Sequence, residues 1–277
     1  MKSKATLSYS RLVKRGLVYM AAIAVALFIL VPIYLITVMA FSPEDVVYGY
    51  PKPLVPRQIT TETIVFFLNS YKMLDSVKIS VIVAILTLII SLLIGAPAGY
   101  ALARYVFVGQ DVYSILILST RAFPAVILSI PLAQTYIQWH LDDTVLGVAL
   151  MHTAMALPTT ILVTSSVFVG ISKELEEAAL TLGCSRFAAF RRIILPLALP
   201  GLAASAIFTF VLSWNEVFAA AILTVHNRTM PARLIVGLGG SPATFKFAGG
   251  FLMLVPAIVF MLFVRRYLFS LWGIKLK

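Results

Sequence analysis

Two ionisable residues interrupt long apolar stretches and are the first candidates for chemistry. Arg121 interrupts the apolar run 112–139, and Glu216 interrupts the run 193–223. An ionisable group at membrane depth is costly and usually has a binding or transport role. The rise along a helix puts the two residues at different heights, which argues against a direct pair. Each is therefore either a residue of a ligand pathway or a buried hydrogen-bond anchor between helices.

Neighbours of these two residues have the chemistry of carbohydrate recognition. Trp214 offers an aromatic face to the C–H side of a sugar, and Asn215 offers an amide to its hydroxyls. Thr120 adds a hydroxyl beside Arg121, and Thr153 and Gln134 are weaker candidates. Tryptophan also gathers at membrane interfaces without any ligand. Binding and structural interpretations of these side chains both stay open.

The sequence offers no catalytic or metal-ligating set. His140, His152 and His226 have no cysteine or carboxylate at ligand spacing, and no Ser/His/Asp arrangement is distinctive. A Gly-x-x-x-x-Gly-Lys-Ser/Thr loop is missing too, so this chain does not cradle a nucleotide. The one cysteine, Cys184, is expected to be a reduced thiol. We therefore predict no catalytic residue, no metal ligand and no cofactor on this chain.

Composition predicts a membrane protein. Hydrophobic residues make up 61% of the 277, charged residues only 12%, and the mean hydropathy is +0.99. A helix needs about 20 apolar residues to cross a bilayer. Six runs qualify, namely 16–41, 79–103, 112–139, 144–172, 193–223 and 247–264. The net charge of +11 then serves mostly membrane orientation, and no nucleic-acid partner is expected.

Basic residues set the expected topology. With six spans both ends share one side, and that side holds about twice as many lysines and arginines as the other. We therefore place both termini in the cytoplasm. The expected organisation is a basic arm (1–15), a first span (16–41), an external loop (42–75), a five-helix membrane domain (76–273) and a cytoplasmic tail (274–277).

The most distinctive segment is the polar, basic stretch 172–196, which falls on the cytoplasmic side. Ser172 is a plausible helix N-cap, and acidic residues follow it where the helix dipole favours them. Ala178 and Ala179 expose little side chain, and Gly183 permits a turn that other residues resist. A short helix–turn–helix is expected here. An ordinary amphipathic interfacial helix is the alternative.

The spacing within this segment resembles the loop by which membrane subunits of ABC importers dock onto their ATPase. The matching residues are Glu177, Ala178, Ala179, Gly183, Ile193, Leu195 and Pro196. Other stretches are similar to the carbohydrate-uptake branch, which includes the maltose-type second permease: Tyr100-Ala101-Leu102-Ala103-Arg104, Leu141-Asp142-Asp143-Thr144, Ser213-Trp214-Asn215-Glu216 and Thr229-Met230-Pro231. The chain departs from that branch at Leu182-Gly183-Cys184 and at its end.

The resemblance implies an all-α membrane protein with the type I ABC importer permease fold, in the bacterial inner membrane. It implies a second permease subunit, two ATPase subunits that hold the ATP and magnesium, an external solute-binding protein, and surrounding lipid. The expected substrate is a sugar, polyol or related small solute. An anion, phosphate ester or polyamine keeps the same architecture, whereas a stand-alone carrier would leave the docking segment unexplained.

Overall fold

The computed structural model describes residues 3–56, 58–70, 72–237 and 240–271, and within them every regular element is helical. The chain divides into two compact units. One unit comprises residues 1–70 and 241–252, and the other comprises residues 71–240 and 253–277.

The first unit is built on the long helix α1 (Ser3–Ala40). Two short helices follow it, α2 (Glu44–Tyr48) and α3 (Glu62–Asn69), and the start of α13 (Ala243–Leu271) completes the unit. Aromatic contacts join these pieces: the Phe41 and Phe251 rings lie 4.9 Å apart, and those of Phe67 and Phe245 lie 4.5 Å apart. The described part of the expected external loop thus contains two short helices.

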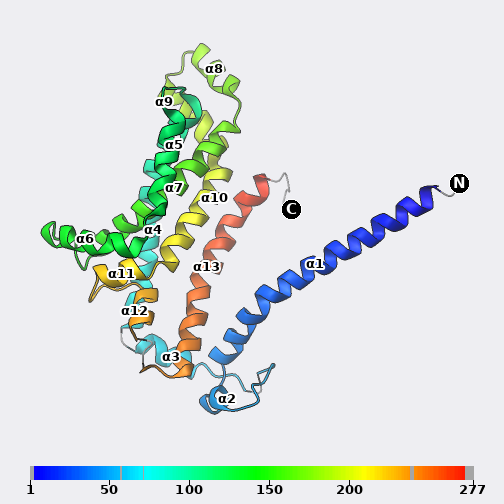
Figure 1. Cartoon of the computed structure of the whole chain (residues 1–277), viewed down its shortest axis with the longest axis vertical. Helices are drawn as coiled ribbons and strands as arrows, with labels where there is room; N and C mark the ends of the chain where they lie inside the picture. Colours follow the sequence, from blue (N-terminus) through cyan, green and yellow to red (C-terminus); the bar gives the residue numbers. More distant parts are fainter. Residues whose placement is uncertain (1–2, 57, 71, 238–239, 272–277) are drawn as a thin grey trace. The chain divides into compact units, whose positions relative to one another are not determined.

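The second unit is a helical bundle whose centre is α4 (Met73–Arg104), packed along α7 (Val145–Val169). Helix α10 (Leu195–Asn215) packs against both. In Figure 1 the short helices α8 (Lys173–Thr181) and α9 (Arg186–Ala189) lie at one end of this bundle, and α11 (Phe218–Leu223) and α12 (Met230–Gly237) lie at the other.

Small residues allow α4 and α7 to approach closely. A Cβ on Gly95 would lie 2.6 Å from Thr160 Cγ2, and one on Gly99 would lie 2.1 Å from Thr164 Oγ1. Thr164 also donates a hydrogen bond to the Gly95 carbonyl across the interface. Close helix packing of this kind is typical of membrane bundles, where small side chains bring backbones together.

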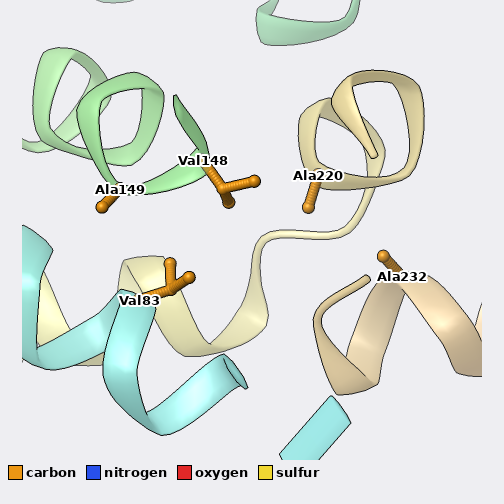
Figure 2. Close-up of a cluster of buried hydrophobic side chains, with 5 residues drawn as sticks. All are labelled: Val83, Val148, Ala149, Ala220 and Ala232. Atoms are coloured by element: carbon orange, nitrogen blue, oxygen red, sulfur yellow. The ribbon is translucent and has the colours of Figure 1, made fainter. Parts of the chain in front are cut away.

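A cluster of small apolar side chains closes the bundle where α11 and α12 meet α4 and α7. Figure 2 shows Val83 of α4, Val148 and Ala149 of α7, Ala220 of α11 and Ala232 of α12, which form one cluster of buried side chains. Their small size lets four helices converge. This cluster packs α11 and α12 against α4 and α7.

Five described helices are long and apolar enough to span a membrane, and a sixth span forms if one bent helix pair is counted. That pair corresponds to the predicted run 112–139, but it is not straight. Helix α5 (Gln110–Ser119) ends in a 3-10 turn, η1 (Thr120–Ala122), and α6 (Ala125–Gln138) leaves at 90°. Pro124 at the start of α6 has no N–H to continue the helix.

The predicted run 193–223 is also divided. Helix α10 ends at Asn215, so Glu216 lies at the break before α11 and not inside a continuous span. The expectation of a charge within this span is therefore wrong. The first helix differs as well, since it begins at Ser3 and includes the residues expected to form a separate basic arm.

Candidate functional site

Residues 172–196 form the predicted helix–turn–helix. The Ser172 hydroxyl accepts a hydrogen bond from the Glu174 N–H and caps α8. Gly183 then adopts a φ of +87°, a left-handed conformation that side-chain-bearing residues rarely take. After α9, a π-helical turn (Phe190–Ile194) leads without interruption into α10. The turn therefore connects a projecting helix to a long membrane helix.

A buried ion pair fastens α8 to the end of α4. Glu176 Oε2 accepts a hydrogen bond from Arg104 Nε at 3.1 Å, and the two side chains are only 10% and 6% exposed. The Tyr100 hydroxyl donates to the other carboxylate oxygen, and Arg104 Nη2 donates to the Ile171 carbonyl at 3.0 Å. This pairing of Glu176 with Arg104 was not predicted from the sequence. The signal that could have indicated this ion pair was a charged residue four positions after the helix cap, at the inward position of α8.

The motif residues divide between an exposed and an inward face. Glu177 and Ala178 are exposed, whereas Ala179 is buried. Ile193 and Leu195 are half-buried and pack with the cluster around Phe168 and Ile194, and Pro196 is exposed. The exposed part of α8 and the turn are thus free to meet another chain, while the remaining motif residues hold the segment to the bundle. Cys184 is half-buried.

A second polar centre lies at the far end of the bundle, around a buried histidine. His152 Nδ1 lies 2.9 Å from Ser213 Oγ, and its Nε2 lies 3.2 Å from Glu216 Oε2. The Glu216 carboxylate also accepts hydrogen bonds from the backbone N–H groups of Ala219 and Ala220. It therefore joins α7 to the start of α11. His152 lacks a carboxylate at sequence spacing, but the fold supplies one from 64 positions away.

Trp214 is buried, and its indole N–H donates to the Met253 carbonyl at 2.8 Å. Its ring stacks near Phe210, with centroids 6.0 Å apart. The neighbouring Asn215 is exposed. The structure therefore separates the two residues that were grouped as sugar-binding candidates, because only Asn215 presents its side chain outward.

Arg121 lies in the η1 turn, between α5 and α6, and is exposed together with Thr120. It lines a hollow of about 220 Å³ with residues of α7 and α10: Ala156, Thr159, Phe208, Thr209, Val211 and Leu212. Within the described ranges Arg121 has no hydrogen bond or ion pair, and the structure does not bring it to Glu216. The expectation that these two charges are not a direct pair is in keeping with this arrangement.

Asp143 connects two loops at the end of the bundle opposite α8. Its Oδ1 accepts hydrogen bonds from the N–H groups of Val225, His226 and Asn227, each at 2.9 Å. Burial alone would raise the pKa of this carboxyl, but these N–H groups outweigh it and lower its pKa below the ordinary value. The resemblance had pointed to this turn without giving Asp143 a function.

No group of three or more metal-ligating side chains exists among the residues whose placement is described. The donors that converge around His152 and Glu176 are hydrogen-bonded to protein groups, and the hollow at Arg121 has a mostly apolar lining with two threonines. Such an arrangement suits recognition of a polar solute and mechanical attachment to partners.

Residues 91–270 match the family described as binding-protein-dependent transport system inner membrane component. The chain belongs to this family, whose members are non-catalytic membrane subunits of ATP-driven importers. Its members work with a second permease, separate ATPase subunits and a solute-binding protein, and they reside in the inner membrane.

Named relatives cover nearly the whole chain. It is 30% identical to the trehalose transport system permease protein SugB of Mycobacterium tuberculosis, over 86% of this chain and 88% of that protein. It is also 30% identical to the arabinooligosaccharides transport system permease protein AraQ of Halalkalibacterium halodurans, over 96% of each.

A solved structure shares the fold. The chain is similar to a bacterial ABC transporter involved in the import of the acidic polysaccharide alginate, with a TM-score of 0.71, 21% identity, and coverage of 97% of this chain and 98% of that one. The predicted type I importer fold is thereby confirmed.

Proposed function

We propose that this permease forms half of the import pathway for a saccharide. The observation that carries the proposal is the 30% identity, over most of the chain, to permeases named for trehalose and for arabinooligosaccharides. The exposed amide of Asn215 and the hydroxyl of Thr120 supply hydrogen-bonding groups suited to sugar hydroxyls. In this proposal Arg121, Thr120 and Asn215 face the solute, whereas Trp214 and Glu216 position the helices around it.

We further propose that both termini and residues 172–196 lie in the cytoplasm, where α8 and the Gly183 turn dock onto an ATPase subunit. Glu177, Ala178 and Leu182 present an exposed, mixed polar and apolar surface there. Movement of the ATPase would reach the bundle by two connections. One is the ion pair from Glu176 to α4, and the other is the continuous backbone into α10.

The docking proposal is tested by placing a bulky side chain in the turn. Gly183→Trp should release the ATPase from the purified complex and abolish ATP-dependent uptake, because the side chain occupies the docking surface. Gly109→Trp is a matched control, since Gly109 has a φ of +88° and, like Gly183, nothing within 4 Å of a built Cβ. Loss of the ATPase in both variants, or in neither, would contradict docking at Gly183.

The cargo is tested separately, with the transporter reconstituted together with its binding protein. Labelled trehalose, an arabinooligosaccharide and methionine are offered in the presence of ATP. We expect accumulation of a saccharide and none of methionine. Uptake of methionine without uptake of either saccharide would contradict the proposed saccharide cargo. It would not affect the docking result.

A further inference from the structure

A proline-rich segment, residues 50–56, folds back beside the end of helix α1. The Leu54 carbonyl in this segment accepts a hydrogen bond from the Tyr34 hydroxyl at 2.9 Å. Tyr34 lies six residues before Ala40, the last residue of α1. After the segment, the Thr60 N–H donates to the Phe41 carbonyl at 2.9 Å, which returns the chain to the end of the helix. The segment therefore lies alongside α1.

The length of α1 gives the depth of this contact in a bilayer. The apolar part of α1, Arg11–Ala40, has 30 residues, and an untilted helix of that length measures about 45 Å. A bilayer with its headgroups is roughly 40–45 Å thick, so Ala40 lies near the outer edge of the headgroups. Tyr34 then lies about 9 Å further in. This is the level where headgroups meet hydrocarbon, and a water-soluble partner reaches it only by displacing lipid.

The side chains of the proline-rich segment suit that level. Tyr50 is 94% exposed, Leu54 71% and Val55 69%, so apolar and aromatic groups point away from the protein. Tyr34 is exposed as well, apart from its bonded hydroxyl. Tyrosine is enriched at membrane interfaces, where its ring meets acyl chains and its hydroxyl stays in polar surroundings. An exposed apolar group of this kind marks an interaction surface.

The backbone of the segment is adapted to a place with little water. Pro51, Pro53 and Pro56 have no N–H, so three of the seven residues bring no donor that needs a partner. The Leu54 carbonyl has its partner in Tyr34. Irregular backbone is not tolerated in the hydrocarbon core itself. The boundary between headgroups and hydrocarbon is thus the deepest level that this segment can occupy.

We propose that residues 50–56 are an interfacial anchor that inserts into the lipid leaflet around the C-terminal end of α1. Tyr50, Leu54 and Val55 contact lipid, and the hydrogen bond from Tyr34 holds the segment at its depth. With both termini in the cytoplasm this is the outer leaflet. The anchor is independent of the transported solute and of ATPase docking.

The test uses the assembled transporter in nanodiscs of phosphatidylethanolamine and phosphatidylglycerol. Leu54→Cys, in a Cys184→Ser background, carries an environment-sensitive fluorophore. Quenching should be about twofold stronger from a lipid nitroxide near the headgroup than from one near the chain end, since interfacial segments lie about 5–10 Å deep. Aqueous iodide should quench this fluorophore weakly. Asp45→Cys is the control, because this exposed acidic position of α2 in the same loop should be quenched mainly by iodide.

Tyr34→Phe tests how the segment is held. Without the hydroxyl, the fluorophore at Leu54→Cys should become more accessible to iodide and less accessible to the lipid nitroxides. The anchor would be overturned by iodide quenching at Leu54→Cys equal to that at Asp45→Cys. It would also be overturned by a fluorophore shielded from both kinds of quencher, since the partner permease would then cover the segment. An unchanged pattern in Tyr34→Phe would contradict the role of Tyr34.

Discussion

At the scale of single residues, the attachment of the docking helix depends on one carboxylate. Glu176 is the only acidic residue of α8 that turns inward, and it meets Arg104 and Tyr100 from α4. Glu174 and Glu177 remain exposed. Besides its backbone connections, α8 is therefore attached to α4 by a buried ion pair.

Neutralising Glu176 should loosen that attachment. Glu176→Gln removes a charge-assisted hydrogen bond, and the expected loss of stability is on the order of 2 kcal/mol. The apparent Tm of the assembled complex should fall, and ATP hydrolysis should become less dependent on the binding protein. Glu174→Gln is the control, since its carboxylate is exposed. If both variants matched the wild type in Tm and in coupling, the ion pair would have no mechanical role.

Some contacts of single residues could not be predicted from the sequence. The inward position of Glu176 and the histidine–carboxylate pair of His152 and Glu216 depend on contacts between helices distant in sequence. Spacing along one segment cannot reveal them. Positions whose geometry is local, such as the Ser172 cap and the left-handed Gly183, could be predicted and are confirmed.

At the scale of elements, close packing of α4 on α7 limits what Gly99 can become. A Cβ there would lie 2.1 Å from Thr164 Oγ1 and 2.7 Å from the Ser165 backbone nitrogen, which cannot rotate away. Gly99→Ala should therefore destabilise the complex by about 1–3 kcal/mol, as overpacking does. Gly16→Ala, with nothing within 4 Å of its Cβ, should leave the Tm unchanged. Equal thermal stability of the two variants would contradict the packing.

Asp143 should give the loop at residues 225–227 an acid-dependent stability. Its folded-state pKa is lowered, so its contribution is complete above the ordinary carboxyl pKa and is lost as the pH falls through the lower, folded value. Limited proteolysis should show the loop opening in acid. Asp143→Asn should open it already at neutral pH, because asparagine tolerates the positive φ but lacks the charge. Asp142→Asn changes an exposed neighbour and should behave as the wild type. If Asp143→Asn also behaved as the wild type, Asp143 would not stabilise this loop.

Element boundaries were the weaker part of the prediction. The apolar runs located the long helices, because hydropathy reports burial in lipid or protein. It could not reveal the 90° bend at η1 or the separation of α10 from α11, since both breaks lie within apolar sequence. In each case a charged residue, Arg121 or Glu216, lies at the break. A lone charge in an apolar run is thus a useful sign of a broken helix.

At the scale of the whole molecule, the composition was sufficient to predict a membrane protein. The docking motif was sufficient to predict its family. An apolar chain with 12% charged residues has to be solvated by lipid, and the docking motif is confined to one segment. The solute is a different matter. The side chains that we propose to face it come from separate elements, and the family works with a second permease.

In the function proposed here, the ATPase subunit binds the turn between α8 and α9. The most direct measurement is cross-linking in the assembled transporter, with Cys184→Ser as background and Ala178→Cys as the exposed reporter on α8. We predict a cross-link from Ala178→Cys to the ATPase subunit, with a yield that changes on ATP binding, and none from Asn227→Cys at the opposite end of the bundle. A cross-link from Asn227→Cys instead, or labelling of Ala178→Cys from outside intact cells, would contradict the account.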